Sequence, residues 1–218
     1  PVDPSSMGSC FIGGNIAENS GGARALKYGV TKDYVLNLEV VLPTGDIIWT
    51  GANTLKNSTG YNLTQLMVGS EGTLGIVTKI VLKLLPQNKH NVLLLVPFYK
   101  ADQACEAVSA IFRAGIVPSA LEFMERDAID WTLKFVDGLN VEVKDNVQAH
   151  LLIEVDGNYP EILMQEAEQI LAVVEQFEID EVLFADTEEQ KNALWKMRRP
   201  VGEAVKSNSI YKEEDTVV

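Results

Sequence analysis

Residues 8–22 read Gly-Ser-Cys-Phe-Ile-Gly-Gly-Asn-Ile-Ala-Glu-Asn-Ser-Gly-Gly and hold five glycines, where average usage of roughly 7% would place about one. Glycine has no Cβ, so its backbone reaches positive φ and can lie directly against another group. Successive N–H groups in such turns form a concavity that suits an anion, such as a diphosphate, or the edge of a flat polar ring. The composition fits a run of tight turns between short strands equally well. The stretch therefore predicts either a ligand-facing loop or a purely structural set of turns.

The stretch differs from the two common nucleotide-binding loops. No Lys-Ser or Lys-Thr follows at the spacing of a P-loop, and no G-x-G-x-x-G opens a helix after a strand. The side chains of Ser9, Asn15, Asn19 and Ser20 are short and polar, so each can bond to the local backbone or to the edge of a ligand. A ligand at this stretch is therefore expected to bind to a different kind of loop.

The chain as a whole is acidic. It has 218 residues, 46% of them hydrophobic, with 18 basic and 31 acidic side chains and a formal charge of −13. This length is typical of one large domain or two small ones. The negative charge disfavours nucleic acid and anionic membrane surfaces as partners, because both need a basic surface. It still allows an acidic small molecule, which one or two local Arg or Lys side chains can bind.

The sequence carries no sign of export. Cys10 and Cys105 are too few for a disulfide framework, and no signal peptide opens the chain. The longest apolar run, 92–98, is much shorter than the ~20 residues of a spanning helix. These features predict a cytoplasmic, reduced protein with no membrane span. The chain opens in what reads as a loop and stops in what reads as a β run, so we expect it to be a fragment.

The first 86 residues read as strands and loops with little helix. Alternating apolar residues over 36–42, turn residues at 43–46 and a return over 47–50 predict a β-hairpin. Asn62 is a good N-cap for a short helix that reaches Met67. A second Gly-rich turn at 69–75 then leads into a strand over 76–85.

From residue 91 the pattern changes to alternating strands and helices. Strands are predicted over 92–96, 120–124, 149–155 and 181–185, and helices over 104–112, 127–135, 163–174 and 188–195. This order predicts an α+β fold in which helices cover one face of an antiparallel sheet, the ferredoxin-like arrangement. The strand over 149–155 places His150 on its opposite, more polar face. The domain boundary is expected near 86–90.

Several motifs in residues 12–78 resemble the flavin domain of the FAD-linked D-2-hydroxy acid dehydrogenases. They are IGGNIAEN at 12–19, KYG at 27–29, LEVVLPTG at 38–45, TGYNL at 59–63 and GSEGTLGIVT at 69–78. The family includes FAD-linked D-lactate dehydrogenase, the flavin subunit of glycolate oxidase and D-2-hydroxyglutarate dehydrogenase, and it belongs to the vanillyl-alcohol-oxidase-type flavoproteins. The resemblance implies that 1–86 is the C-terminal half of an FAD-binding domain. It also implies that 91–218 is the N-terminal part of an incomplete substrate (cap) domain.

The resemblance places FAD along two loop regions, with the first Gly-rich segment near the pyrophosphate and the flavin. The residues that it implies bind the cofactor are Gly8, Ser9, Cys10, Gly13, Gly14, Asn15, Ala17, Asn19, Gly22, Tyr28, Gly29, Glu71, Gly72, Gly75, Ile76 and Val77. Family members also carry an earlier flavin-binding subdomain and a later portion with a metal-associated His pair and a Glu-His pair, which this sequence lacks. We therefore expect the chain by itself to bind FAD weakly or not at all, and to be inactive.

The segment 194–203 is the candidate substrate-binding region. Pro200 has no N–H and crowds the carbonyl of Lys196, so a helix should kink or end there. The planar fork of an arginine suits a carboxylate, because it forms two parallel hydrogen bonds. The resemblance implies that Arg198 holds the substrate carboxylate and that Lys212 is a second contact. The alternative is that Arg198 and Lys212 are ordinary surface charges. For Arg199 and the acidic run 213–215, a surface position is the favoured interpretation.

No metal site is predicted within the chain. His90 falls in the proposed linker and His150 on a strand, and neither has a second His, a Cys or paired carboxylates at ligand spacing. Cys10 lies inside the Gly-rich stretch, but it has no visible His partner that would activate it as a nucleophile.

The sequence thus predicts a fragment of an FAD-dependent dehydrogenase that oxidises a D-2-hydroxy acid to the 2-keto acid by hydride transfer. The expected partners are a lactate- or glycolate-like substrate and an unidentified electron acceptor, with a histidine base beyond residue 218. The oligomeric state stays open, a homo-oligomer included. Two alternatives remain. One is an oxidase of the same superfamily that acts on an alcohol, phenol or sugar and needs no carboxylate clamp. The other is a non-enzymatic ferredoxin-like interaction module joined to a β-rich scaffold.

Overall fold

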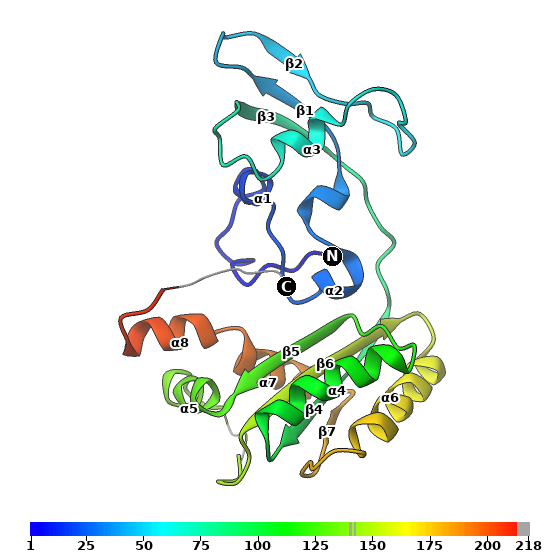
Figure 1. Cartoon of the computed structure of the whole chain (residues 1–218), viewed down its shortest axis with the longest axis vertical. Helices are drawn as coiled ribbons and strands as arrows, with labels where there is room; N and C mark the ends of the chain where they lie inside the picture. Colours follow the sequence, from blue (N-terminus) through cyan, green and yellow to red (C-terminus); the bar gives the residue numbers. More distant parts are fainter. Residues whose placement is uncertain (140, 142, 213–218) are drawn as a thin grey trace. The chain divides into compact units, whose positions relative to one another are not determined.

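The computed structural model describes residues 1–139, 141 and 143–212, and the chain divides into two compact units, 1–87 and 88–218 (Figure 1). The predicted acidic face at 213–215 lies outside the described residues. Each unit has its own hydrophobic cluster.

The first unit is a small antiparallel sheet with short helices. Its helical elements are α1 (Ile12–Glu18), α2 (Ala25–Tyr28), the 3₁₀ turn η1 (Thr31–Tyr34) and α3 (Leu63–Met67). Its strands are β1 (Val35–Val41), β2 (Ile47–Trp49) and β3 (Ile76–Leu82), in the order β2-β1-β3. Leu38 and Val40 on the central strand are fully buried, and Ile16 of α1 and Met67 of α3 pack in the same cluster. The predicted hairpin is confirmed, and so is the Asn62 cap, whose Oδ1 accepts from Gln65 N–H at 3.0 Å.

The Gly-rich stretch differs from its prediction, because residues 12–18 form a helix rather than a run of turns. Glycine costs about 1 kcal/mol relative to alanine inside a helix, so Gly13 and Gly14 do not favour this conformation. Ile16 compensates, since its side chain has no exposed surface and packs in the cluster with β1. Asn19 then ends the helix in the left-handed conformation, at φ 52°. Tertiary packing has overridden local preference here.

The second unit is an antiparallel four-stranded sheet with helices between its strands. Its strands are β4 (His90–Phe98), β5 (Ala120–Glu125), β6 (Ala149–Gly157) and β7 (Leu183–Ala185). Its helices are α4 (Ala101–Arg113), α5 (Arg126–Phe135), α6 (Pro160–Val174), α7 (Glu188–Arg198) and α8 (Val201–Asn208). The strand order is β5-β6-β4-β7, the ferredoxin-like order, with α5 as an addition between the second and third strands. The predicted α+β class is confirmed.

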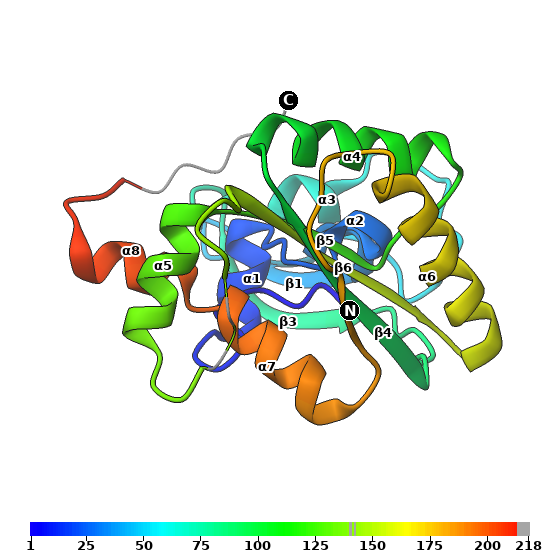
Figure 2. The ribbon, with the colours of Figure 1, turned by 90° about the horizontal axis from the view of Figure 1, so that it is seen from below.

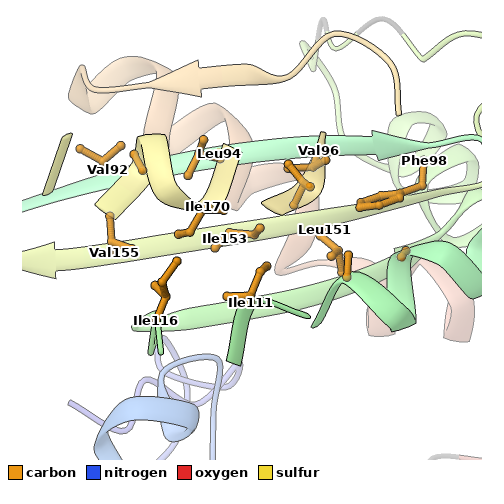
Figure 3. Close-up of a cluster of buried hydrophobic side chains, with 14 of the residues drawn as sticks. Val92, Leu94, Val96, Phe98, Ile111, Ile116, Leu151, Ile153, Val155 and Ile170 are labelled. Atoms are coloured by element: carbon orange, nitrogen blue, oxygen red, sulfur yellow. The ribbon is translucent and has the colours of Figure 1, made fainter. Parts of the chain in front are cut away.

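The main core lies between this sheet and the helices α4 and α6. Alternate residues of β4 and β6 point to one face, and Figure 3 shows them meeting Ile111 of α4 and Ile170 of α6. These strand residues are Val92, Leu94, Val96, Phe98, Leu151, Ile153 and Val155. Each fully buried aliphatic or aromatic side chain contributes about 1.5–3 kcal/mol. For β6 this face was predicted from the two-residue period of 149–155.

The opposite face of the sheet is covered as well, which the sequence pattern did not predict. Figure 2 shows α4 and α6 along one face of the strands and α7 along the other. Leu152, Glu154 and His150, which alternate with the core residues of β6, are 0%, 0% and 3% exposed. His150 is therefore on the second face, as expected, but this face is buried although it carries polar groups.

In the part of the chain that the structure describes, no helix has both the length and the apolar character that crossing a bilayer requires.

Candidate functional site

The two Gly-rich segments of the first unit meet through their backbones. The N–H of Gly69 donates to the carbonyl of Ile16 at 2.9 Å, and the N–H of Glu71 donates to that of Ala17 at 3.0 Å. Residues at positive φ surround this junction, among them Asn19 at 52°, Glu71 at 51° and Gly72 at 73°. Two segments that are about 50 residues apart in the sequence are thus joined by backbone hydrogen bonds.

Four glycines on these loops have an open side. At Gly8, Gly13, Gly14 and Gly72, apart from the adjoining residues and, for Gly13 and Gly14, the backbone of α1 itself, no atom of the described residues lies within 4 Å of the place a Cβ would occupy. All four are exposed. Bare backbone of this kind can approach a flat ring or a diphosphate without a side chain in between. This open backbone fits a dinucleotide cofactor.

Three polar side chains among the predicted cofactor residues bond to other parts of the first unit. Ser9 Oγ donates to the carbonyl of Ser6 at 3.3 Å, and Asn15 Nδ2 donates to Cys10 Sγ at 3.6 Å. The Asn19 side-chain oxygen accepts from Lys32 N–H at 2.9 Å. These contacts fix the path of the loop, so these side chains shape the surface whether or not they also contact a ligand.

Three predicted cofactor glycines are required by the chain itself. A Cβ on Gly22 would collide with the carbonyl of Asp3, and one on Gly75 would lie 2.6 Å from Val40 Cγ1. Gly29, at φ 76°, has no room for a Cβ beside the Asp33 carboxylate, which accepts from Val30 N–H at 2.8 Å.

The remaining positions in this set lie beside these turns and on the edge strand. The carbonyl of Tyr28 accepts a hydrogen bond from the Tyr34 hydroxyl. Ile76 is 68% exposed at the start of β3, where Val77 is half-buried against the core. A cofactor role for any single position in the set stays a prediction.

The second candidate region is Arg198, in the last turn of α7. The guanidinium donates from Nε to Glu122 Oε2 at 2.8 Å, and Nη2 lies 2.5 Å from the same oxygen. Glu122 comes from β5, and the two side chains are 28% and 16% exposed. A guanidinium has five N–H donors, so one carboxylate oxygen uses only part of its capacity. Arg198 can therefore hold a second carboxylate while Glu122 keeps its orientation.

The other predicted residues of this region lie elsewhere. Pro200 separates α7 from α8, as the sequence predicts. Lys212 follows α8, is exposed, and belongs to no helix or strand. The Arg199 guanidinium lies 5.3 Å from the centre of the Trp195 ring, a cation–π contact. The structure thus places Arg198 in a structured polar setting and leaves the role of Lys212 a prediction.

A cleft of about 190 Å³ opens beside His150 on the same unit. Its walls are mostly apolar, with Leu95, Pro97 and Leu183 among them, and the Lys144–Asp180 ion pair, at 2.8 Å, lies at its rim. The Nδ1 atom of His150 is buried and has no hydrogen-bond partner among the described residues. Burial, followed by the nearby charge of Arg126, lowers the pKa of His150 from 6.5 to about 4. This imidazole is therefore neutral at physiological pH.

Among the described residues, no three side chains of the His, Cys, Asp and Glu types gather closely enough to hold a metal ion.

Sequence reasoning missed two acidic residues, Glu122 and Glu154. Glu154 is fully buried on β6, where Oε1 accepts from Ser119 Oγ at 2.9 Å and Oε2 accepts from Trp195 Nε1 at 3.2 Å. The available signal was a glutamate inside an otherwise apolar run, 151–155, because charged residues are almost never fully buried without partners. Which partners it has depends on residues far along the chain.

Two family models match the chain. Residues 87–218 match the family model "FAD linked oxidases, C-terminal domain", and residues 1–51 match "FAD binding domain".

The chain is also similar to named curated proteins. It is 46% identical to glycolate oxidase subunit GlcD of Bacillus subtilis, over 91% of this chain and 42% of that protein. It is 40% identical to D-lactate dehydrogenase of Anaerostipes hadrus, over 100% of this chain and 46% of that protein. It is 32% identical to mitochondrial D-2-hydroxyglutarate dehydrogenase of Arabidopsis thaliana, over 97% of this chain and 38% of that protein. The chain thus spans less than half the length of each of these relatives.

Solved structures agree on the fold. A structure of alkyldihydroxyacetonephosphate synthase is similar with a TM-score of 0.71 and 21% identity, over 90% of this chain and 37% of that one. Another structure of that protein gives a TM-score of 0.66 at 20% identity, over 91% of this chain and 37% of that one. At these identities the likeness concerns the fold alone. The matched domain models, which account for most of the sequence, establish that this chain belongs to the FAD-linked oxidases.

Proposed function

We propose that the protein containing this chain oxidises a D-2-hydroxy acid, of the lactate or glycolate type, to the corresponding 2-keto acid. The observation that carries the proposal is Arg198, which is three-quarters buried and is oriented by Glu122 with donors to spare. The names of the relatives, which include D-lactate dehydrogenase and a glycolate oxidase subunit, support the same substrate class.

Different groups are assigned to cofactor binding, substrate binding and proton transfer. When bound, FAD supplies the hydride acceptor for the reaction. The open backbone at Gly8, Gly13, Gly14 and Gly72 would hold it. Arg198 binds the substrate carboxylate through its planar fork, which fixes the orientation of the α-carbon. Lys212 is proposed as a second contact to the carboxylate. The hydroxyl proton needs a base, which we assign to a histidine outside this sequence.

A substrate screen tests the proposal. The intact protein, purified gently, is expected to show the visible absorbance of a flavin. Under anaerobic conditions, a D-2-hydroxy acid should bleach this absorbance, and turnover should appear with an artificial electron acceptor. The screen compares the two enantiomers of lactate and of 2-hydroxyglutarate with glycolate, and adds an alcohol, a phenol and a sugar. Bleaching only by the last three would favour an oxidase of another specificity, and absence of flavin would overturn the proposal.

A matched pair of glycine substitutions tests the cofactor surface. Gly14→Ala places a methyl group in open space within α1, so it should stabilise the protein by up to about 1 kcal/mol and yet lower the flavin content of the intact protein. Gly75→Ala forces a methyl group against Val40 and the carbonyl of Val41, at 2.6 and 2.9 Å, and should destabilise by about 1–3 kcal/mol. The measurements are the ratio of flavin to protein absorbance and the thermal midpoint. Full flavin content in Gly14→Ala would contradict a ligand at this surface.

A further inference from the structure

One side of α7 carries three hydrogen-bond donors, and each reaches a different strand of the sheet. The donors, Lys191, Trp195 and Arg198, are four and three positions apart, so they share one face of the helix. Their acceptors are Asn91 on β4 at 2.9 Å, Glu154 on β6 at 3.2 Å and Glu122 on β5 at 2.8 Å. These strands are neighbours in the sheet. The helix is therefore attached to the sheet by one polar contact per strand.

Glu154 is the centre of this attachment. Its side chain is fully buried, and besides Ser119 and Trp195 its carboxylate accepts from Asn91 Nδ2 at 3.1 Å. Asn91 in turn accepts from Lys191, which is 7% exposed, so Glu154 is linked to two of the three anchors of α7. Removing the carboxylate would leave several buried donors without an acceptor, at a cost of about 1–3 kcal/mol for each.

The position of Arg198 follows from the position of Trp195. The two residues are three apart on one helix, and a helix turns by about 100° and rises about 1.5 Å per residue. If α7 slipped by one residue on the sheet, the guanidinium would swing away from Glu122. The bond between Trp195 Nε1 and the Glu154 carboxylate opposes this slip from within the buried layer, where water cannot replace it.

We propose that Glu154 is a positioning residue, which fixes through Trp195 the place where the guanidinium of Arg198 meets the substrate carboxylate. This inference rests on the carboxylate-binding role proposed above for Arg198. Glu154 itself touches neither the substrate nor the cofactor. It acts on substrate affinity by holding α7 in one register.

Two substitutions at position 154 separate geometry from charge. Glu154→Gln keeps an acceptor oxygen for Trp195 and Asn91. Its amide can donate to Ser119 Oγ once the single hydroxyl hydrogen of Ser119 turns from the side chain to the main-chain carbonyl of residue 154, at 3.0 Å. Glu154→Met has a similar shape and removes the acceptors. In the intact protein, Glu154→Gln should keep KM for the hydroxy acid, and the inhibition constant of oxalate as a carboxylate probe, within about 3-fold of wild type. Glu154→Met should raise both by about 10-fold or more.

A second pair of variants keeps the inference testable if Glu154→Met does not fold. Trp195→Phe removes a single donor and keeps an aromatic ring, and should raise the oxalate inhibition constant about 3- to 10-fold. Trp131→Phe on α5, a tryptophan that makes no bond to Glu154, is the control and should stay within 2-fold. A purely structural role would reduce the amount of active protein, which lowers apparent kcat and leaves KM and the oxalate constant unchanged.

The outcomes distinguish this inference from the function on which it rests. If wild type neither turns over a hydroxy acid nor binds oxalate, the proposed function has failed. If wild type binds oxalate and Arg198→Met does not, yet folded Glu154→Met and Trp195→Phe bind it as tightly as wild type, the positioning role is overturned and the proposed function stands.

Discussion

Replacing Arg198 with methionine in the intact protein is expected to lower kcat/KM for a D-2-hydroxy acid by about 10²- to 10⁴-fold. The estimate follows from two charge-assisted hydrogen bonds to the substrate carboxylate, each contributing about 1.5–3 kcal/mol, where 1.4 kcal/mol is a factor of ten. Arg198→Lys keeps the charge and loses the planar fork, so its activity should fall between wild type and Arg198→Met. Steady-state kinetics with an artificial electron acceptor measure the effect.

Two further variants separate substrate binding from folding. Arg199→Met removes the adjacent guanidinium, which lies over the Trp195 ring, and should change kcat/KM by less than about threefold. Arg198→Met also leaves the part-buried Glu122 carboxylate without its cation, which lowers stability. The double variant Glu122→Gln/Arg198→Met should regain that stability and stay inactive. Full turnover of hydroxy acids by a folded Arg198→Met protein would favour the oxidase alternative, which needs no carboxylate clamp.

Acidification is expected to destabilise the second unit through His150. Its pKa is about 4 in the folded protein, where burial is the main cause, and 6.5 as the reference value. Below pH 6.5 the unfolded chain takes up a proton that the folded chain does not. The contribution of neutral His150 to the free energy of unfolding is therefore complete above pH 6.5 and is lost as the pH falls toward 4. With 1.36 kcal/mol per pKa unit, the loss amounts to about 3 kcal/mol.

The matched variant for this prediction is His150→Leu, which removes the titration and keeps an apolar side chain of similar size. Hydrogen-exchange protection of the β4 and β6 amides, measured at pH 7, 5.5 and 4.5, reports the stability of this unit. Carboxylates contribute to the pH dependence of both proteins, so the difference between wild type and variant is the relevant quantity. Parallel pH profiles for the two proteins would show that His150 does not titrate in this window.

Sequence reasoning succeeded where the signal was local. The two-residue period of 149–155 marks the core face of β6, and the apolar run 92–98 marks β4 as a strand. Thr187 marks the start of α7 because its hydroxyl accepts from the N–H of Gln190 three residues later. The motif pattern of the glycine loops identified the family. Each of these features can be seen within a window of about ten residues, which is why it could be predicted.

Features that depend on distant residues could not be predicted. Glu122 meets Arg198 across 76 positions, and Glu154 meets Trp195 across 41. No spacing in the sequence links these pairs. The second buried face of the sheet was missed for the same reason, since the sequence placed His150 on a more polar face of its strand and gave no sign that α7 would bond to Glu154 on that face. The helix over Ile12–Glu18 was missed because its stability comes from the burial of Ile16 rather than from helix propensity.

The strand order of the second unit governs how the nascent chain can fold. β4 is translated first, but its long pairing partner is β6, and β5 also pairs with β6 rather than with β4. β4 and β5 therefore leave the ribosome before the strand that joins them exists. Until Gly157 has emerged, the valine and leucine side chains of β4 lack the strand that covers them in the folded unit.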